Sequence, residues 1–358
     1  MRYRIKHSTR YEYADQVNQG YNVAYLIPRE CNGQRVNFSD IRIIPTPASK
    51  IKRVDYFGNV VCHFTVEKPH RSLEVIVESE VEIAPSEPRL LSGGITCAEV
   101  REILLNGSSD EDVKASEFCF DSPMIAVTSE LVEFARDIFT PDRPFLEAVS
   151  ALNSRIFNDF KYDPGFSTVA TPLKDVMASR RGVCQDFAHL AIGALRGLGF
   201  AARYVSGYLE TLPPPGQVKL EGADASHAWF SVYIPGDEWQ DFDPTNDVMP
   251  ADQHITTAWG RDYSDVTPLK GVVFGGGGKQ ILSVAVDVSR LETPDRPLLP
   301  PTAVPTRREG DLPVQDPLTS PLSPAQQSQS QQNQSQASPS TTQLLQTQTQ
   351  SQLPPRNF

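Results

Sequence analysis

The stretch Gly182-Val183-Cys184-Gln185-Asp186-Phe187-Ala188 opens a segment whose apolar residues recur at helical spacing. These apolar positions form one stripe, which ends at Gly199: Phe187, Ala188, Ala191, Ala194, Leu195 and Leu198. Cys184 lies three and four residues before the first two, so its thiol is predicted to point along the buried face of the helix. The macrodipole and the free backbone N–H groups at a helix N-terminus favour a thiolate and can also bind an oxyanion. A buried structural cysteine is the alternative interpretation.

A histidine and an acid follow the cysteine, each in a stretch that alternates like a β-strand. If the loop between the two strands is residues 234–236, His227 stands directly across from Asp243, and Trp229 across from Asp241. Asp243 would then hold one ring nitrogen of His227 and leave the other for the sulfur. Taken singly, His227 also fits a satisfied histidine on a half-buried strand, and Asp243 fits an acid that caps a turn.

The three residues Cys184, His227 and Asp243 are the types needed to make and hold a thiolate–imidazolium pair. In such a pair the acid orients the imidazole, and the imidazole takes up and returns the proton. The set therefore predicts acyl-transfer chemistry through a cysteine nucleophile.

The first 85 residues alternate apolar and polar side chains as only strands do. One predicted face carries Tyr3, Ile5, His7, Thr9, Tyr11 and Tyr13, and the pattern recurs in residues 73–83. The turn-forming Phe57-Gly58-Asn59 precedes a further alternating segment. We therefore expect residues 1–85 to form an antiparallel β-sandwich domain.

The rest of the chain divides by its changing periodicity. Residues 86–127 are expected to be a polar linker, residues 128–290 an α+β catalytic core and residues 291–358 a disordered tail rich in Pro, Ser and Gln. Helices are predicted to begin near Thr128, Pro144 and Thr171. Strands are predicted at residues 201–210, 226–234, 239–243 and 281–288.

Composition and charge narrow the class of protein. With 358 residues and 39% hydrophobic content, the chain has enough apolar material for packed cores. The net charge of −11 argues against a nucleic-acid partner. The five cysteines are odd in number and scattered, which favours reduced thiols, and no apolar run suggests a signal peptide or membrane segment. We therefore expect a cytoplasmic protein with no membrane partner; its oligomeric state is not predicted.

No motif predicts a metal ion or a cofactor. The sequence has no Cys-x-x-Cys, no His-Glu-x-x-His and no calcium loop. A thiol mechanism needs none of these groups, so none is expected.

Five segments carry a family resemblance: GVCQDFAHL (182–190), ARYVSGYL (202–209), GADASHAWFSVYIPG (222–236), DFDPTN (241–246) and HITTAWGRDYSDV (254–266). Together they resemble the bacterial transglutaminase-like family of cysteine peptidases, and residues 1–85 resemble the β-rich domain that precedes this core in bacterial members. The resemblance covers most of residues 1–290. It implies a papain-like α+β fold with Cys184 as nucleophile, His227 as general base and acid, and Asp243 as the residue that orients the imidazole.

Three further residues are candidates for the site. Some animal relatives place a tryptophan ahead of the nucleophile to stabilise the oxyanion, whereas this chain has no tryptophan before Trp229. Tyr162 is the upstream candidate for that role. Asp224 is expected either to bind substrate or to cap a turn, and Trp229 is a candidate for substrate binding.

The function predicted on this basis is hydrolysis of an amide or isopeptide bond of a peptide-like substrate through a thioester. Transfer of the acyl group to an amine is the first alternative, because the same three residues serve both reactions. A non-catalytic peptide-binding module is the second.

Overall fold

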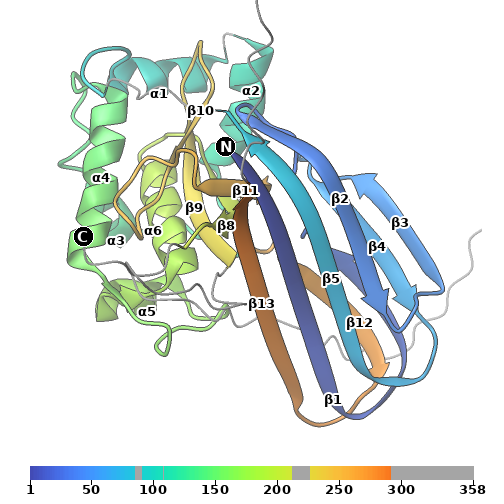
Figure 1. Ribbon diagram of the computed structural model, residues 1–358. Coiled ribbons are helices and arrows are strands. Elements are labelled where there is room, and N and C mark those ends of the chain that lie inside the picture. The colour runs from blue at the N-terminus through green and yellow to red at the C-terminus, as the bar shows by residue number, and fades with distance from the viewer. Residues whose placement is uncertain (85–90, 108, 212–225, 292–358) are drawn as a thin grey trace, which may run out of the picture. The chain divides into compact units, whose positions relative to one another are not determined.

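The computed structural model describes residues 1–84, 91–107, 109–211 and 226–291, which all belong to one compact unit (Figure 1). Asp224 and the predicted tail beyond Leu291 lie outside the described residues. No helix in the described part is both long and apolar enough to cross a bilayer. Antiparallel sheets and helices together confirm the predicted α+β class.

The strand β1 (Arg2–Ala24) organises the N-terminal sheet. The sheet also contains β2 (Gln34–Ile44), β3 (Ser49–Val54), β4 (Val60–Val66) and β5 (His70–Ile83), in the order β2-β5-β1-β4-β3. The first half of β1 pairs with β5 and the second half with β4, and the register shifts between Glu12 and Val17. As the alternation predicts, Tyr3, Ile5, His7, Thr9 and Tyr11 are all buried.

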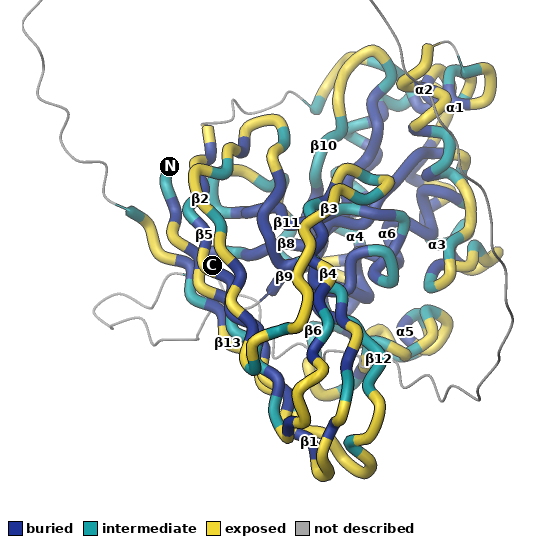
Figure 2. Tube along the Cα trace, turned by 90° about the vertical axis from the view of Figure 1, so that its right-hand side faces the viewer, coloured by how far each residue is buried: buried dark blue, intermediate teal, exposed yellow. Residues whose placement is uncertain are grey.

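This sheet folds over on itself, so that its two halves share one hydrophobic core. Ile43 of β2 and Val75 of β5 belong to the same core as Cys62 and Phe64 of β4. The outermost strand β3 is exposed along its whole length, as Figure 2 shows. The predicted antiparallel sandwich is therefore made from a single bent sheet.

Two strands from the far end of the described chain complete this sheet. β12 (Leu269–Gly275) pairs with the second half of β1, and β13 (Gln280–Leu291) pairs with the first half, from Arg2↔Leu291 to Tyr13↔Gln280. The strand predicted at residues 281–288 exists, but its assignment to the catalytic core is wrong. Alternation identifies a strand without identifying the sheet that it joins.

In the sequence, the described helices lie after β5 and before β12. They are α1 (Cys97–Asn106), α2 (Asp110–Ser116), the short η1 (Glu117–Cys119), α3 (Ser129–Ala135), α4 (Phe145–Asp159), α5 (Leu173–Ser179) and α6 (Cys184–Gly197). Residues 91–119 were expected to be linker, yet Val100, Leu104 and Phe118 are buried in one core with α6. Polar composition hid these helices, because α1 buries only Cys97, Val100 and Leu104, and α2 buries only Asp112 and Ala115.

A second antiparallel sheet supports the remaining part of the fold. It has the order β10-β9-β8-β11, with β8 (Ala202–Leu209), β9 (Ser226–Tyr233), β10 (Trp239–Phe242) and β11 (His254–Gly260). The helix α6 packs against β8 and β9, and both strands are almost wholly buried. A further short pair, β6 (Lys161–Tyr162) and β7 (Arg181–Gly182), runs parallel just before α6.

The hairpin register predicted for β9 and β10 is wrong by two residues. Asp241 pairs with Ser231 instead of Trp229. A shift of two keeps every side chain on its predicted face of the sheet. Asp243 therefore stays on the face of His227 and reaches it diagonally.

Hydrogen bonds fasten the bent sheet to β11. The Gln34 side-chain amide donates to Thr256 O at 2.7 Å and accepts from Thr256 N at 2.8 Å. The Asn59 side chain makes the same two-way contact with the backbone of Trp259, at 2.8 and 2.9 Å. Both contacts pair amide groups in both directions, which fixes the position of β11 against the sheet.

Candidate active site

Cys184 is the first residue of α6, as predicted, and only 1% of its surface is exposed. The preceding Val183 has no side-chain atom that can accept a hydrogen bond, so its side chain does not cap the N–H groups of the first turn. Asp186 instead accepts from the backbone N–H of Val183 at 2.8 Å and from the hydroxyl of Ser167. The carboxylate thus secures the turn before the helix.

Tyr162 lies beside this helix N-terminus. The short parallel pairing sets Tyr162 opposite Gly182, two residues before Cys184. Burial, together with the charge of Cys184, raises the pKa of the Tyr162 phenol well above its usual range. The phenol therefore stays protonated at neutral pH and is a hydrogen-bond donor near the sulfur, as its proposed role requires.

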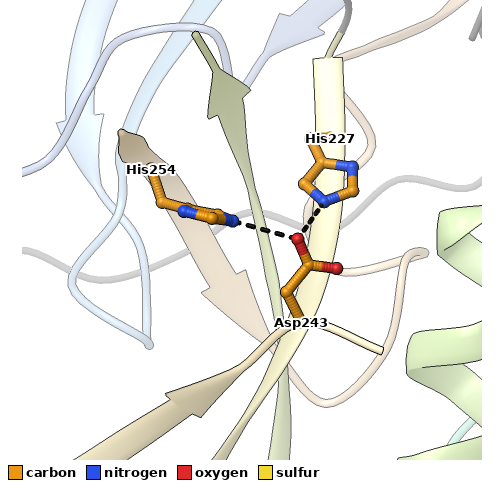
Figure 3. A group of neighbouring side chains, drawn as sticks. All are labelled: His227, Asp243 and His254. Carbon is orange, nitrogen blue, oxygen red and sulfur yellow. Dashed lines mark hydrogen bonds and ion pairs between the residues drawn. The ribbon is translucent and has the colours of Figure 1, made fainter. Parts of the chain in front are cut away.

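His227 and Asp243 meet as predicted. The imidazole Nε2 lies 2.8 Å from the Asp243 carboxylate oxygen Oδ2 (Figure 3). A carboxylate only accepts, so Nε2 carries the proton and Nδ1 is left for the thiol. A side-chain hydrogen bond with Cys184 is among the interactions that raise the pKa of His227. The structure thus brings the three predicted residues together.

Asp243 is fully buried at the centre of a wider network. Its Oδ2 also lies 3.0 Å from Nε2 of His254 and 2.7 Å from the side-chain nitrogen of Asn246, and its Oδ1 accepts from Thr245 N at 2.9 Å. Figure 3 shows both imidazoles directed at the same oxygen. The carboxylate is held by four donors, so its orientation toward His227 is fixed.

His254 and Asn246 were not singled out from the sequence. His254 begins one segment of the family resemblance, and Asn246 ends another, but neither spacing nor periodicity indicates that they meet at Asp243. A buried carboxylate needs more than one hydrogen-bond donor. The burial of Asp243 therefore implies further donors, but the sequence does not identify them.

The electrostatics of the pair favour the charged forms. Burial alone would lower the pKa of His227, but the Asp243 charge, the hydrogen bond to it and the interaction with Cys184 raise that pKa to about 10. Burial would likewise raise the pKa of Asp243, and the two histidines outweigh it and hold that pKa well below its usual range. A buried imidazolium next to a carboxylate is therefore stable at neutral pH.

Trp229 was expected to contact substrate, but the structure places it in the interior. It is fully buried, its indole N–H donates to Asp241 at 2.9 Å, and its ring lies 6.0 Å from that of His227. A Cβ at Gly207 would come within 2.5 Å of the Trp229 ring, so glycine is needed there for the ring to lie close to β8. Trp229 supports the imidazole from behind and has no surface to offer a substrate.

His227, Asp243 and His254 also form a group whose ligand atoms lie within 4.8 Å of one another, close enough to hold a metal ion. The same three atoms already make two hydrogen bonds of ordinary length. Because a metal ion would have to displace both protons, hydrogen bonding is the assignment that the distances support.

Comparisons with known proteins identify the family and the fold. Residues 3–82 match the model of the bacterial transglutaminase-like N-terminal region, and residues 132–244 match that of the transglutaminase-like superfamily. An uncharacterized protein of Mycobacterium tuberculosis is 40% identical over 298 residues, which are 81% of this chain and 93% of that protein. A protein-glutamine gamma-glutamyltransferase of Pseudomonas aeruginosa is 30% identical over 108 residues, 28% of this chain and 16% of that enzyme.

A solved structure has the same fold. It is titled "a Putative Cysteine Protease" of Cytophaga hutchinsonii; it is 22% identical, with a TM-score of 0.62 over 82% of this chain and 91% of that one. Both domains of the resemblance are thus matched in sequence, and the fold is matched in space. The chain belongs to the transglutaminase-like superfamily and carries the bacterial transglutaminase-like N-terminal region.

Proposed function

We propose that the protein is a cysteine-dependent hydrolase that cleaves an amide or isopeptide bond of a peptide-like substrate through a thioester intermediate. The observation that carries this proposal is the chain of contacts from Cys184 through His227 to Asp243, in which the imidazolium is stabilised by a buried carboxylate. Such a pair supplies a thiolate and a proton at the same point.

In this proposal the Cys184 sulfur attacks the carbonyl carbon, and the C–N bond breaks as His227 donates its Nδ1 proton to the leaving amine. Water then attacks the thioester while Nδ1 of His227 takes its proton, and the thiolate leaves. Asp243 keeps the proton on Nε2 throughout, so the nitrogen facing the sulfur is always the one that exchanges protons.

The oxyanion formed in each step needs donors. The N-terminus of α6 supplies backbone N–H groups, and the protonated phenol of Tyr162 is the side-chain donor proposed to act with them. A Tyr162→Phe variant removes one donor, so we expect slower formation of the acyl-enzyme with little change in substrate affinity.

Transfer of the acyl group to an amine is the second candidate. It is favoured by the local similarity to a protein-glutamine gamma-glutamyltransferase, whose name describes that reaction. The two candidates share the thioester and differ only in the group that attacks it.

One experiment tests both. The full chain is mixed with short peptides bearing glutamine, asparagine or an activated ester, and the covalent adduct on Cys184 is measured by mass spectrometry. Release of free acid with or without added primary amine indicates hydrolysis, whereas an amide product formed from the amine indicates transfer. Failure of every peptide to acylate Cys184 would contradict both and favour a binding module.

A further inference from the structure

A cavity of about 750 Å³ lies on the same face of the second sheet as His227 and Asp243. It is bounded by the turn after β1, the segment from α2 to η1 and the β9–β10 hairpin. Asp241 and His254 line it, whereas neither Cys184 nor His227 is among its described lining residues. We call it the Arg203 cavity, after the residue discussed next.

Arg203 of β8 is an unusual lining residue because its charge is buried. It is 8% exposed, its Nε has no hydrogen-bond partner, and no ion pair joins it to another described residue. Its Cζ lies 4.3 Å from the ring centre of Trp239 and 3.7 Å from that of Trp259, and all three residues line the cavity. Stacking stabilises the flat faces of a guanidinium but does not supply an acceptor for the Nε–H donor at its edge.

Asp241, the acid whose charge acts on Arg203, makes no ion pair with it among the described residues. Asp241 lines the same cavity and lowers the cost of the charge, but its carboxylate accepts the indole N–H of Trp229. Burial lowers the pKa of Arg203 to about 9, so the guanidinium is still charged at neutral pH. An arginine that is buried, charged and without a hydrogen-bonded acid is costly unless a ligand provides one.

The lining indicates which anion fits. A guanidinium edge matches a carboxylate, with two parallel N–H···O bonds. The walls are aromatic, with Tyr56, Phe57 and Phe118 beside the two tryptophans. Further acids, Glu111, Glu117, Asp237 and Glu238, also line the cavity and disfavour a multiply charged phosphate.

We propose that the Arg203 cavity binds a small acyl-amino acid or peptide by its carboxylate, which the Arg203 guanidinium receives between Trp239 and Trp259. A basic group elsewhere on the ligand suits the acids of the lining. His254 adds a polar contact, because its Nδ1 is buried without a partner while its Nε2 contacts Asp243. This site is separate from the thiol, so the proposal does not rest on the proposed reaction.

Two ligands that differ only in charge test the proposal: N-benzoylarginine and N-benzoylarginine amide. Both keep the aromatic ring and the basic group, and only the first has the carboxylate. The full chain with Cys184→Ala is used, so that no reaction interferes, and binding is followed by calorimetry and by the fluorescence of the tryptophans in the lining. We expect the acid to bind at least tenfold more tightly than the amide.

Variants locate the binding. Arg203→Met should abolish the preference for the acid, Arg203→Lys should retain part of it, and Arg155→Met, which removes a distant surface ion pair with Asp137, should leave it unchanged. Equal affinity for acid and amide, no binding of either ligand, or a preference that survives in a folded Arg203→Met variant would each overturn the proposal. The comparison of the two ligands on the parent protein stands even if Arg203→Met does not fold.

Discussion

Among the described residues, two helices begin with a buried cysteine, and at one of them the cysteine also contacts an imidazole. Cys97 opens α1 and Cys184 opens α6, with exposed fractions of 0% and 1%. At α1 the N-cap Thr96 accepts from Glu99 N, and the backbone N–H groups of Cys97 and Ala98 donate to carbonyls of the loop before α4. At α6 the N-cap is a valine, and an imidazole lies at the sulfur.

A helix N-terminus alone does not lower the pKa of a buried thiol. Burial raises the pKa of Cys97 to about 11, in spite of the nearby Arg101 and Arg143. The other scattered cysteines follow the same rule, since burial also raises the pKa values of Cys31 and Cys119 to about 11. At Cys184 the neighbouring group is the imidazole of His227, which Asp243 holds.

The largest expected effect comes from removing each thiol in turn. Cys184→Ala should lower the rate of substrate acylation by roughly 10⁴-fold or more, because the nucleophile is lost. Cys97→Ala is the matched control at the same helix position and should leave the rate within about twofold. The rates are measured on the peptide that acylates best. A comparable loss in Cys97→Ala, with the fold intact, would remove the distinction between the two helices.

The acid gives the next largest effect. Asp243→Asn should lower the acylation rate by roughly 10³- to 10⁴-fold, because an amide neither stabilises the imidazolium nor fixes its tautomer. Asp241→Asn is the control, since Asp241 bonds Trp229 and not His227; it should cost less than about tenfold. The result would contradict the assignment if the Asp241 variant were the more damaged of the two.

The labelling contrast between the two thiols should depend on pH. At pH 6 iodoacetamide should modify Cys184 at least about 100-fold faster than Cys97, because the thiolate is the reacting form. Above the pKa of Cys97, about 11, the ratio should shrink as that thiol ionises. Peptide mapping after brief labelling measures both rates in one sample. Equal labelling rates of Cys184 and Cys97 at pH 6 would contradict the proposal that the imidazole activates Cys184.

His227 and Cys97 should lower the free energy of unfolding over different ranges of pH. The pKa of His227 is raised from 6.5 to about 10, so its contribution to the free energy of unfolding is complete below pH 6.5 and falls as pH rises to 10. The slope is at most about 1.4 kcal/mol per pH unit. Cys97, raised from 9.0 to about 11, contributes such a loss only above pH 9.

Denaturant unfolding at pH 6.5 and pH 8.5 measures the first window. The parent protein should lose more stability between these pH values than His227→Gln does, whereas Cys97→Ala should behave like the parent. A His227→Gln variant with the same pH dependence as the parent would show that the imidazolium does not stabilise the fold.

The smallest effect is expected from truncation after Leu291. The sheet is complete at that residue, so both the melting temperature and the ratio of Cys184 to Cys97 labelling should be unchanged. Truncation after Gly278 is the positive control. It removes β13, which pairs with the first half of β1, and should unfold the sheet. A fall of several degrees on truncation after Leu291 would show that the tail packs on the folded part.

Local patterns in the sequence predicted most strands and the meeting of His227 with Asp243. Alternation has a period of two, so it places Asp243 on the correct face and cannot detect a shift of two residues. The same limit explains β13: its alternating residues are as compatible with one sheet as with the other. Sheet membership depends on contacts between residues at opposite ends of the described chain, such as Arg2 and Leu291, which no local pattern contains.

The sequence predicted the three central residues of the candidate site but not the residues that surround them. Cys184 at the head of an apolar stripe, and the strand residues His227 and Asp243, are local features. The second imidazole at Asp243 and the unsatisfied guanidinium of Arg203 arise from how β8, β10 and β11 are arranged, so their partners could not be read from spacing. Trp229 was misassigned because an aromatic residue near a site is equally suited to support and to contact.

The pairing of β1 with β13 also governs the order in which the chain can fold during synthesis. The first strand leaves the ribosome long before the last, so the edge of β1 that receives β13 has to wait while the helices and the second sheet are made. Long-range pairing of this kind closes a large loop and is slow. Arg2 and Leu291 end as neighbours, so a circular permutant that joins them and opens a surface turn elsewhere would supply β13 and β1 together and relieve that delay.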